Sequence, residues 1–183
     1  MTNPYEIGKT IYLRTPTKND INVNWYQWFS DPETTEFLID RWWPNSIENQ
    51  ENFYNQIIQN KTSLVLSVCD KNTDKHIGVC SLSSINWVHR YADVAIVIGE
   101  KKFRNGVIAV EIMTLLLKIA FKRINLLNLR SVFVKSHPYT PSLMNLFKFK
   151  EVGSLKEFFY HKDKYVDLVI SQLQRHNWQK RNK

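Results

Sequence analysis

The segment from Gly99 to Arg123 joins the end of a predicted strand, a short basic loop and a long apolar helix. Lys101, Lys102 and Arg104 stand beside the expected start of that helix. The first N–H groups of a helix have no partner within it and lie at the positive end of its dipole, so neighbouring cations complete a site for an anion. The segment therefore predicts a binding site for a phosphate-bearing ligand.

The same loop excludes two common nucleotide sites. It contains one glycine, Gly106, whereas a nucleoside triphosphate loop requires the pattern GxxxxGKS/T and a dinucleotide site requires GxGxxG. The ligand must be held by a different kind of phosphate loop.

The charge of the whole chain also favours an anionic partner. Its 25 Lys and Arg residues against 17 Asp and Glu residues give a net charge of +8, which suits a nucleotide, a phosphate-bearing cofactor or nucleic acid. The sequence has no zinc-finger spacing, no basic leucine-zipper pattern and no RNP-type run. We therefore expect no nucleic-acid partner.

The two cysteines, Cys69 and Cys80, lie in apolar strand-like runs, where a buried free thiol is the common state. We expect neither a disulfide nor a metal site. No apolar run approaches the roughly 20 residues that cross a bilayer, and the N-terminus has no apolar signal region. These features predict a soluble, cytoplasmic protein without a membrane partner.

Apolar periodicity and capping residues divide the chain into a series of predicted elements. Strands are predicted at 11–14, 63–69, 76–85, 91–99, 128–136, 152–161 and 164–173, and helices at 17–29, from 31, from 46, at 107–123 and at 140–148. Nothing divides residues 1–174, so one domain is expected. Residues 175–183 add cations without an apolar period and are predicted to form a solvated basic tail.

This order of elements resembles that of the GNAT acyl-CoA N-acyltransferase family. The segment from Trp25 to Leu38, with Asp31-Pro32-Glu33 inside it, resembles the opening of the branch that holds ribosomal-protein and amino-sugar N-acetyltransferases. Phe149 to Gly153, followed by Lys164 to Leu168, resembles the closing motif of that branch. The resemblance implies an α/β (α+β) fold with a mixed, mostly antiparallel sheet of about seven strands flanked by helices.

The resemblance also implies acetyl-CoA as cosubstrate and no metal. The family loop that holds the CoA pyrophosphate corresponds to Arg104, Asn105, Gly106, Val107, Ile108 and Ala109. Val107 stands where the family has a glycine, and its Cβ brings bulk toward the ligand. In the family, the strand before this loop splays from its neighbour, and backbone groups corresponding to those near Val97 and Ile98 contact the pantetheine and the acetyl group.

Acetyl transfer to an amine requires a neutral amine, a donor for the developing oxyanion and a proton for the leaving thiolate. Asp93 stands where branch members carry an acidic residue, and we expect it to deprotonate the ammonium through water. The alternative is a strand carboxylate paired with a neighbouring Arg or Lys.

The family tyrosine that protonates the thiolate is replaced by Met144. Ser136, His137, Tyr139 and Ser142 lie close by in the sequence, and Tyr139 is the predicted general acid. The alternatives are that Tyr139 only packs on the helix start and that the thiolate takes its proton from solvent or from the acceptor.

Arg41, Trp42 and His89 are predicted to bind the acceptor, because an indole face suits stacking and an Arg suits phosphate. The alternative for the Trp42 loop is a hydrophobic latch over the helices. The expected function is an acetyl-CoA-dependent N-acetyltransferase that acts on a primary amine, best the amino group of a nucleotide-linked amino sugar. The N-terminal amine of a protein and a noncatalytic acyl-CoA-binding role are the alternatives, and a homodimer is one assembly that the sequence leaves open.

Overall fold

An eight-stranded mixed sheet organises the chain in the computed structural model, which describes residues 1–39 and 43–181. The strands lie in the order β1-β2-β3-β4-β5-β6-β8-β7, and only β5 and β6 are parallel. They are β1 (Pro4–Ile7), β2 (Ile11–Arg14), β3 (Leu64–Asp70), β4 (His76–Asn86), β5 (Tyr91–Ile98), β6 (Asn128–Val134), β7 (Lys150–His161) and β8 (Lys164–Gln174). The predicted fold class and mostly antiparallel sheet are confirmed, and the edge strand β1 is the strand that was not predicted.

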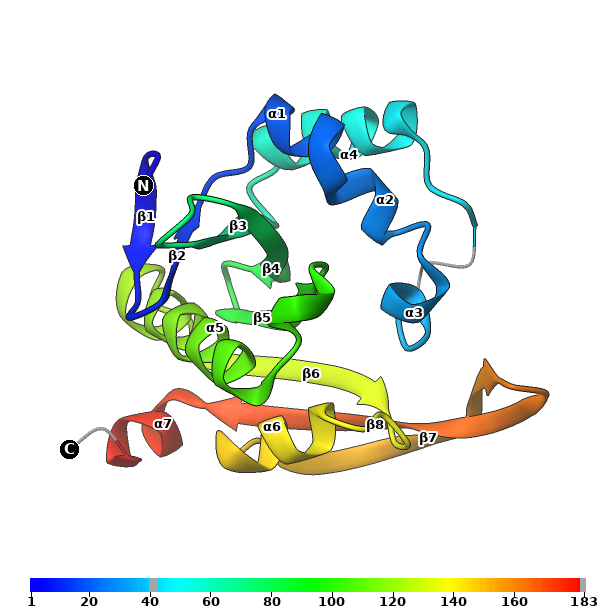
Figure 1. The fold of residues 1–183 in the computed structure, drawn as a ribbon. Helices are drawn as coiled ribbons and strands as arrows, with labels where there is room; N and C mark the ends of the chain where they lie inside the picture. Colours follow the sequence, from blue (N-terminus) through cyan, green and yellow to red (C-terminus); the bar gives the residue numbers. More distant parts are fainter. Residues whose placement is uncertain (40–42, 182–183) are drawn as a thin grey trace.

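Helices cover both faces of this sheet (Figure 1). They are α1 (Lys18–Asp20), the π-helical turn η1 (Ile21–Trp25), α2 (Tyr26–Trp28), α3 (Pro32–Thr35), α4 (Ile47–Gln59), the 3-10 turn η2 (Lys101–Phe103), α5 (Gly106–Lys118), the π-helical turn η3 (Ile119–Arg123), α6 (Thr140–Leu146) and α7 (Arg175–Arg181). None of the helices in residues 1–39 and 43–181 has the length and apolar character needed to cross a membrane.

The core is divided between the two faces of the sheet. On the face of α5 and α6, one large cluster runs from β2 across the sheet to β8 and includes Ala92 and Val94 of β5. Since side chains alternate along a strand, Asp93 points to the opposite face, the face of α1 and α4. That face holds two separate clusters, one around Trp28 and one around Val134.

The end of the chain differs from its prediction. Residues 175–181 are not a solvated tail but form α7, in which the Trp178 ring lies 5.3 Å from the Phe121 ring. Lys122 places its ammonium 5.6 Å from the same indole. A single partly buried tryptophan gives no apolar period, which is why the local pattern did not indicate the helix. The division of the chain after residue 174 stays a prediction.

Trp28 packs directly on the backbone at the end of β5. A Cβ added to Gly99 would lie 1.9 Å from Trp28 Cδ2, whereas one added to Gly153 would meet nothing within 4 Å. We expect Gly99→Ala to lower the free energy of unfolding by about 1–3 kcal/mol, since the buried indole must move. Gly153→Ala is the matched control. Urea unfolding checks this, and equal losses in both variants would contradict it.

A buried polar network fixes α1 to the sheet. Arg14 donates two hydrogen bonds to the Asp20 carboxylate, at 2.7 and 2.6 Å, and Ser67 Oγ donates a third at 3.0 Å. His76 lies beside this network with Nδ1 at 3.5 Å from Asp20 Oδ1, and its Nε2 donates to the Gly78 carbonyl at 2.8 Å. His76 is 8% exposed, so the network sits in a low-dielectric interior.

This burial predicts acid sensitivity. Desolvation lowers the pKa of His76 from its ordinary value of 6.5 to about 4. The unfolded chain therefore gains a proton near pH 6.5 that the folded chain takes up only near pH 4, and the stability present above pH 6.5 falls by about 3 kcal/mol as the pH drops through this window. In His76→Phe that slope should flatten, as measured by urea midpoints at pH 7, 5.5 and 4.5. An identical slope in both proteins would contradict the assignment.

Candidate active site

Strands β5 and β6 separate partway along their length. They pair in parallel only from Tyr91–Asn128 to Asp93–Arg130. Beyond these residues β5 pairs only with β4, and β6 pairs only with β8. We call this opening, the part of β5 after Asp93 and of β6 after Arg130, the fork (Figure 1). The sequence predicted that the strand before the basic loop would splay from its neighbour, and the pairing confirms it.

The fork leaves backbone groups of β5 without a strand partner on one side. The Gly99 N–H donates to the Ile77 carbonyl at 3.0 Å, in register with the β4–β5 ladder. Antiparallel hydrogen-bonded pairs alternate, so the N–H and C=O of Val97 also point at β4, while those of Ile96 and Ile98 point into the fork. The backbone groups of Val97 therefore point away from the fork, whereas those of Ile96 and Ile98 point into it, and the cofactor contacts themselves stay a prediction.

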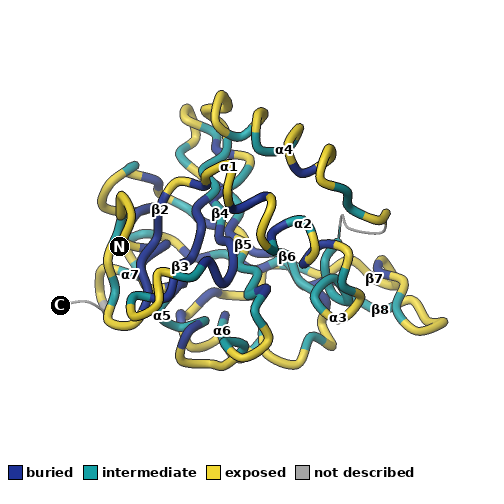
Figure 2. The backbone as a smooth tube through the Cα atoms, turned by 45° about the horizontal axis from the view of Figure 1, so that its top comes forward, coloured by how far each residue is buried: buried dark blue, intermediate teal, exposed yellow. Residues whose placement is uncertain are grey.

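On the sheet face that carries α1 and α4, side chains of both strands border the fork. Val97 packs with the Trp28 cluster, and Val132 of β6 packs with Phe37 in the other cluster. Ala95, between Asp93 and Val97 on the same face, is exposed. The two clusters thus lie on either side of an exposed part of β5. Figure 2 shows the buried centre of the sheet beside the more exposed β7–β8 hairpin.

Asp93 and Arg130 form an ion pair where the fork begins. Arg130 Nε donates to Asp93 Oδ1 at 2.6 Å, and Nη2 donates to Oδ2 at 2.8 Å. These hydrogen bonds raise the pKa of Arg130 above its ordinary value. The pairing with a neighbouring arginine, one of the two interpretations of Asp93, is present in the structure. It does not exclude the other, because a carboxylate has lone pairs beyond the two that accept from Arg130.

The start of α5 retains free donors. Asn105 is the N-cap, and its Oδ1 accepts from the Ile108 N–H at 3.0 Å. Gly106 and Val107 are the first two residues of the helix, and their N–H groups have no acceptor within it. Val107 is 71% exposed, and nothing lies near Gly106 on its open side. At the place of the predicted anion site, the structure therefore has two backbone donors at the positive end of a 13-residue helix.

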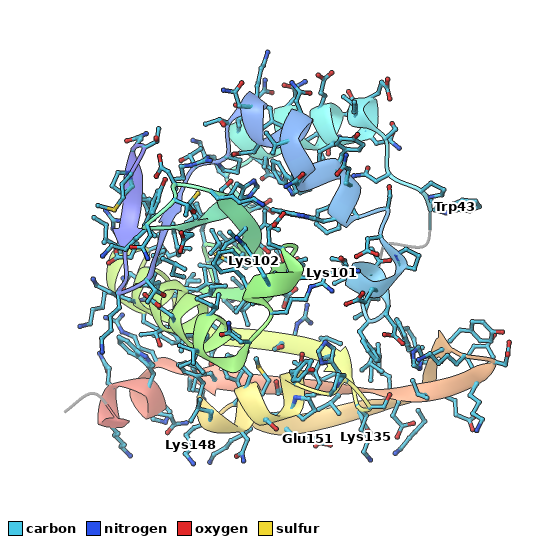
Figure 3. The ribbon with its side chains drawn as sticks, in the orientation of Figure 1. Trp43, Lys101, Lys102, Lys135, Lys148 and Glu151 are labelled. Carbon is cyan, nitrogen blue, oxygen red and sulfur yellow. The ribbon has the colours of Figure 1, made fainter. Side chains whose placement is uncertain are left out.

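Arg104 does not take its predicted place in that site. Its guanidinium donates to the Ile98 and Gly99 carbonyls at 3.0 and 3.1 Å and to Glu33 at 2.8 Å. Lys101 also pairs with Glu33, at 2.5 Å, while the Lys102 ammonium lies 5.0 Å from the Phe103 ring (Figure 3). Two of the three loop cations therefore hold α3 to the end of β5.

Of the three residues predicted to bind the acceptor, the structure describes His89. Arg41 and Trp42 lie outside the described residues, and their neighbour Trp43 is 87% exposed (Figure 3). His89 lies in the β4–β5 turn, where its N–H donates to Asn86 Oδ1 at 2.7 Å. This turn precedes β5, at the end where β5 and β6 are still paired. The fork opens at the other end of the strand, so His89 lies away from it, and its role in acceptor binding stays a prediction.

Tyr139 stands directly before α6 with its side chain 75% exposed, and Met144 is buried. His137 Nδ1 accepts the N–H groups of Tyr139 and Thr140, both at 3.1 Å, so this imidazole caps α6. Burial lowers the pKa of His137. The sequence indicated the position of Tyr139, but no pattern in it showed the cap.

A second cluster was missed because its members are far apart in the sequence. The Phe37 ring lies 4.7 Å from that of His137 and 4.9 Å from that of His161. His161 Nε2 lies 2.9 Å from Glu36 Oε1, and Lys162 also pairs with Glu36, at 2.7 Å. The contacts of Glu33 attach α3 to the end of β5. The bonds of Glu36 attach the residues after α3 to the β7–β8 hairpin.

One pocket, with a volume of about 360 Å³, lies beside α6 on the other face of the sheet. Phe133, Met144 and Phe149 form its apolar part, with Lys135 and Glu151 at its rim (Figure 3). Asp93 and Arg130 do not line it, so it is separate from the fork.

Comparison with known proteins identifies the class. Residues 10–144 match the family model described as "Acetyltransferase (GNAT) domain". The chain belongs to the GNAT family, and it is an acetyl-CoA-dependent N-acetyltransferase of the GNAT type. A search of curated proteins finds no match. The particular branch predicted from the sequence, that of ribosomal-protein and amino-sugar enzymes, is not confirmed.

Solved structures share the fold along almost the whole chain. Spermidine N-acetyltransferase from Vibrio cholerae, in complex with CoA and spermine, aligns with a TM-score of 0.86 at 20% identity and covers 94% of this chain and 99% of its own. A dodecameric structure of the V. cholerae enzyme in an intermediate state has a TM-score of 0.81 at 21% identity and covers 96% and 100%. A probable acetyltransferase has a TM-score of 0.82 at 16% identity and covers 96% and 98%. At these identities the likeness concerns the fold.

Proposed function

We propose that this chain transfers the acetyl group of acetyl-CoA to the primary amine of a small molecule bound over the fork. One observation carries the proposal: β5 and β6 separate after Asp93, and β5 then leads within a few residues to the free N–H groups that begin α5. A thioester in the fork and a pyrophosphate at the helix start are thereby held by one continuous segment. The acceptor approaches from the face to which Asp93 points.

Each group in the reaction has a proposed partner. The N–H groups of Gly106 and Val107 bind the pyrophosphate, and the fork-facing backbone of Ile96 and Ile98 orients the pantetheine and the thioester carbonyl. Asp93 takes the proton of the ammonium directly or through water, and the Tyr139 hydroxyl returns one to the departing thiolate. The amide forms as the C–S bond breaks, so the products are the N-acetylated amine and CoA.

The acceptor is proposed at the level of a small primary amine. The V. cholerae enzyme is named for spermidine and was solved with spermine, so a polyamine belongs in any acceptor panel for this chain. The amino sugar and the protein N-terminus expected from the sequence belong there too. We further propose a homo-oligomer, in line with the dodecameric neighbour, and a cytoplasmic location, which suits the two free buried thiols.

A coupled pair of measurements tests transfer. The midpoint temperature of thermal unfolding should rise as acetyl-CoA is added. A ligand that binds only the native state stabilises it once the ligand concentration exceeds Kd. A thiol reagent should then report CoA release when a panel of primary amines is added. Binding of acetyl-CoA without CoA release for any amine would overturn the transferase proposal in favour of a noncatalytic role.

A further inference from the structure

Within residues 1–39 and 43–181, the carboxylates around the fork pair with cations of this chain. Glu33 pairs with Lys101 and Arg104, and Asp31 lies within 3.6 Å of Arg104. On the hairpin side Glu36 pairs with Lys162 and His161, and Asp93 pairs with Arg130. These four described carboxylates thus face four permanent cations and one imidazole, so this set of groups has no net negative charge.

This arrangement is unsuited to a polycation. A polyamine with several ammonium groups needs unpaired carboxylates, and complementary potential is what draws a charged ligand to its site. Here each carboxylate that accepted from an ammonium of the ligand would also keep a cation of this chain beside it, within a chain of net charge +8. The electrostatics of this site therefore differ from those expected of a polyamine acceptor site.

Arg130 has N–H donors available for a ligand. Its side chain is 51% exposed, and Asp93 takes hydrogen bonds from Nε and Nη2. A guanidinium has five N–H donors. Within the described residues, the three that do not bond Asp93 are available to a carboxylate or phosphate oxygen. Asp93 and Arg130 are register partners on adjacent parallel strands, which lie about 4.8 Å apart. This spacing suits an ammonium and an anionic group within one small molecule.

Building on the proposed function, we propose that the acceptor carries a carboxylate or phosphate near its primary amine, that Arg130 binds this anionic group, and that polyamines are poor acceptors. Arg130 then determines specificity, while Asp93 receives the amine. The positive charge of the chain contributes to acceptor binding as well as to cofactor binding.

Matched acceptors test the proposal, because each pair keeps the amine and changes the anion. Lysine against cadaverine reports a carboxylate, and glucosamine 6-phosphate against glucosamine reports a phosphate. In the parent, at least one anionic member should exceed its partner in kcat/KM by about 10- to 100-fold, the range for a hydrogen bond to a charged group. In Arg130→Gln that ratio should fall toward one, and in Arg130→Lys it should be partly kept.

Lys118→Gln is the control variant, since it removes a comparably exposed cation that pairs with Glu6 on another part of the molecule. Its ratio should match that of the parent. Preference for spermidine or cadaverine over the anionic acceptors, or an unchanged ratio in Arg130→Gln, would overturn the proposal.

Calorimetry with CoA-loaded protein separates this proposal from the transferase proposal. Inorganic phosphate, or the preferred anionic amine, should bind the parent and Lys118→Gln and bind at least 10-fold more weakly to Arg130→Gln. If no amine is turned over but this difference is found, transfer fails and the anion site stands. Equal binding to all three proteins would refute the anion site whatever the turnover.

Discussion

Replacing Gly106 by proline should weaken acetyl-CoA binding about 10- to 100-fold, the loss expected when one charge-assisted hydrogen bond is removed. Gly106 is the first residue of α5, where proline is well tolerated because the lost N–H has no helical partner. The preceding Asn105 already has φ −136° and ψ 160°, the extended conformation that a residue before proline prefers. The substitution therefore removes a ligand donor while the helix start is kept.

Gly106→Ala is the matched control, because it keeps the N–H and its Cβ meets nothing within 4 Å. Its Kd should stay within a few-fold of the parent value. Isothermal titration calorimetry gives both affinities, and urea unfolding shows that both variants are folded. An unchanged Kd in a folded Gly106→Pro protein would place the pyrophosphate elsewhere.

The order of elements was predictable because each buried element carries its own apolar period. The chain β3–β4–β5–α5 is an example, since its strands and helix are long, the strands carry apolar residues toward both faces of the sheet and the helix packs on one of them. The edge strand β1 was not, because its four residues begin with proline and pair with β2 alone. An element with one partner and few buried side chains leaves little pattern to read.

The site was predictable where it depends on local sequence. The helix start at Gly106 and the strand before it follow from neighbouring residues. The contacts of Arg104 do not, since its partner Glu33 lies 71 residues away in the sequence. Likewise, which backbone groups of β5 face the fork depends on the register with β4, which no local period of β5 contains.

The position of His89 relative to the fork likewise depends on more than local sequence. A sequence shows that His89 and Asp93 are close in the chain, but a strand extends about 3.3 Å per residue. His89 precedes β5, so the paired residues Tyr91 to Asp93 lie between it and the fork. Proximity in sequence suggested that His89 lies near the site, whereas the strand geometry places it at the opposite end of the paired residues of β5 and β6.

Asp93→Asn should lower turnover by about 10²- to 10⁴-fold, the range for a lost general base. Asparagine keeps the shape of the side chain but cannot accept the proton of the ammonium. The lost ion pair with the half-exposed Arg130 should cost no more than about 1 kcal/mol of folding stability. The Kd of acetyl-CoA should be unchanged, since the cofactor donors lie at Gly106 and Val107.

The pH profile distinguishes a base from a structural partner of Arg130. An amine with an ordinary pKa near 10 becomes its own source of free base as the pH rises, so the defect of Asp93→Asn should shrink between pH 6 and 9.5. Asp167→Asn is the control, because Asp167 is a similarly buried carboxylate paired with Lys156 on the β7–β8 hairpin, and its turnover should match the parent. If Asp93→Asn stays within a few-fold of the parent at every pH, then the carboxylate serves only to orient Arg130, and the amine must lose its proton to water before it reaches the thioester.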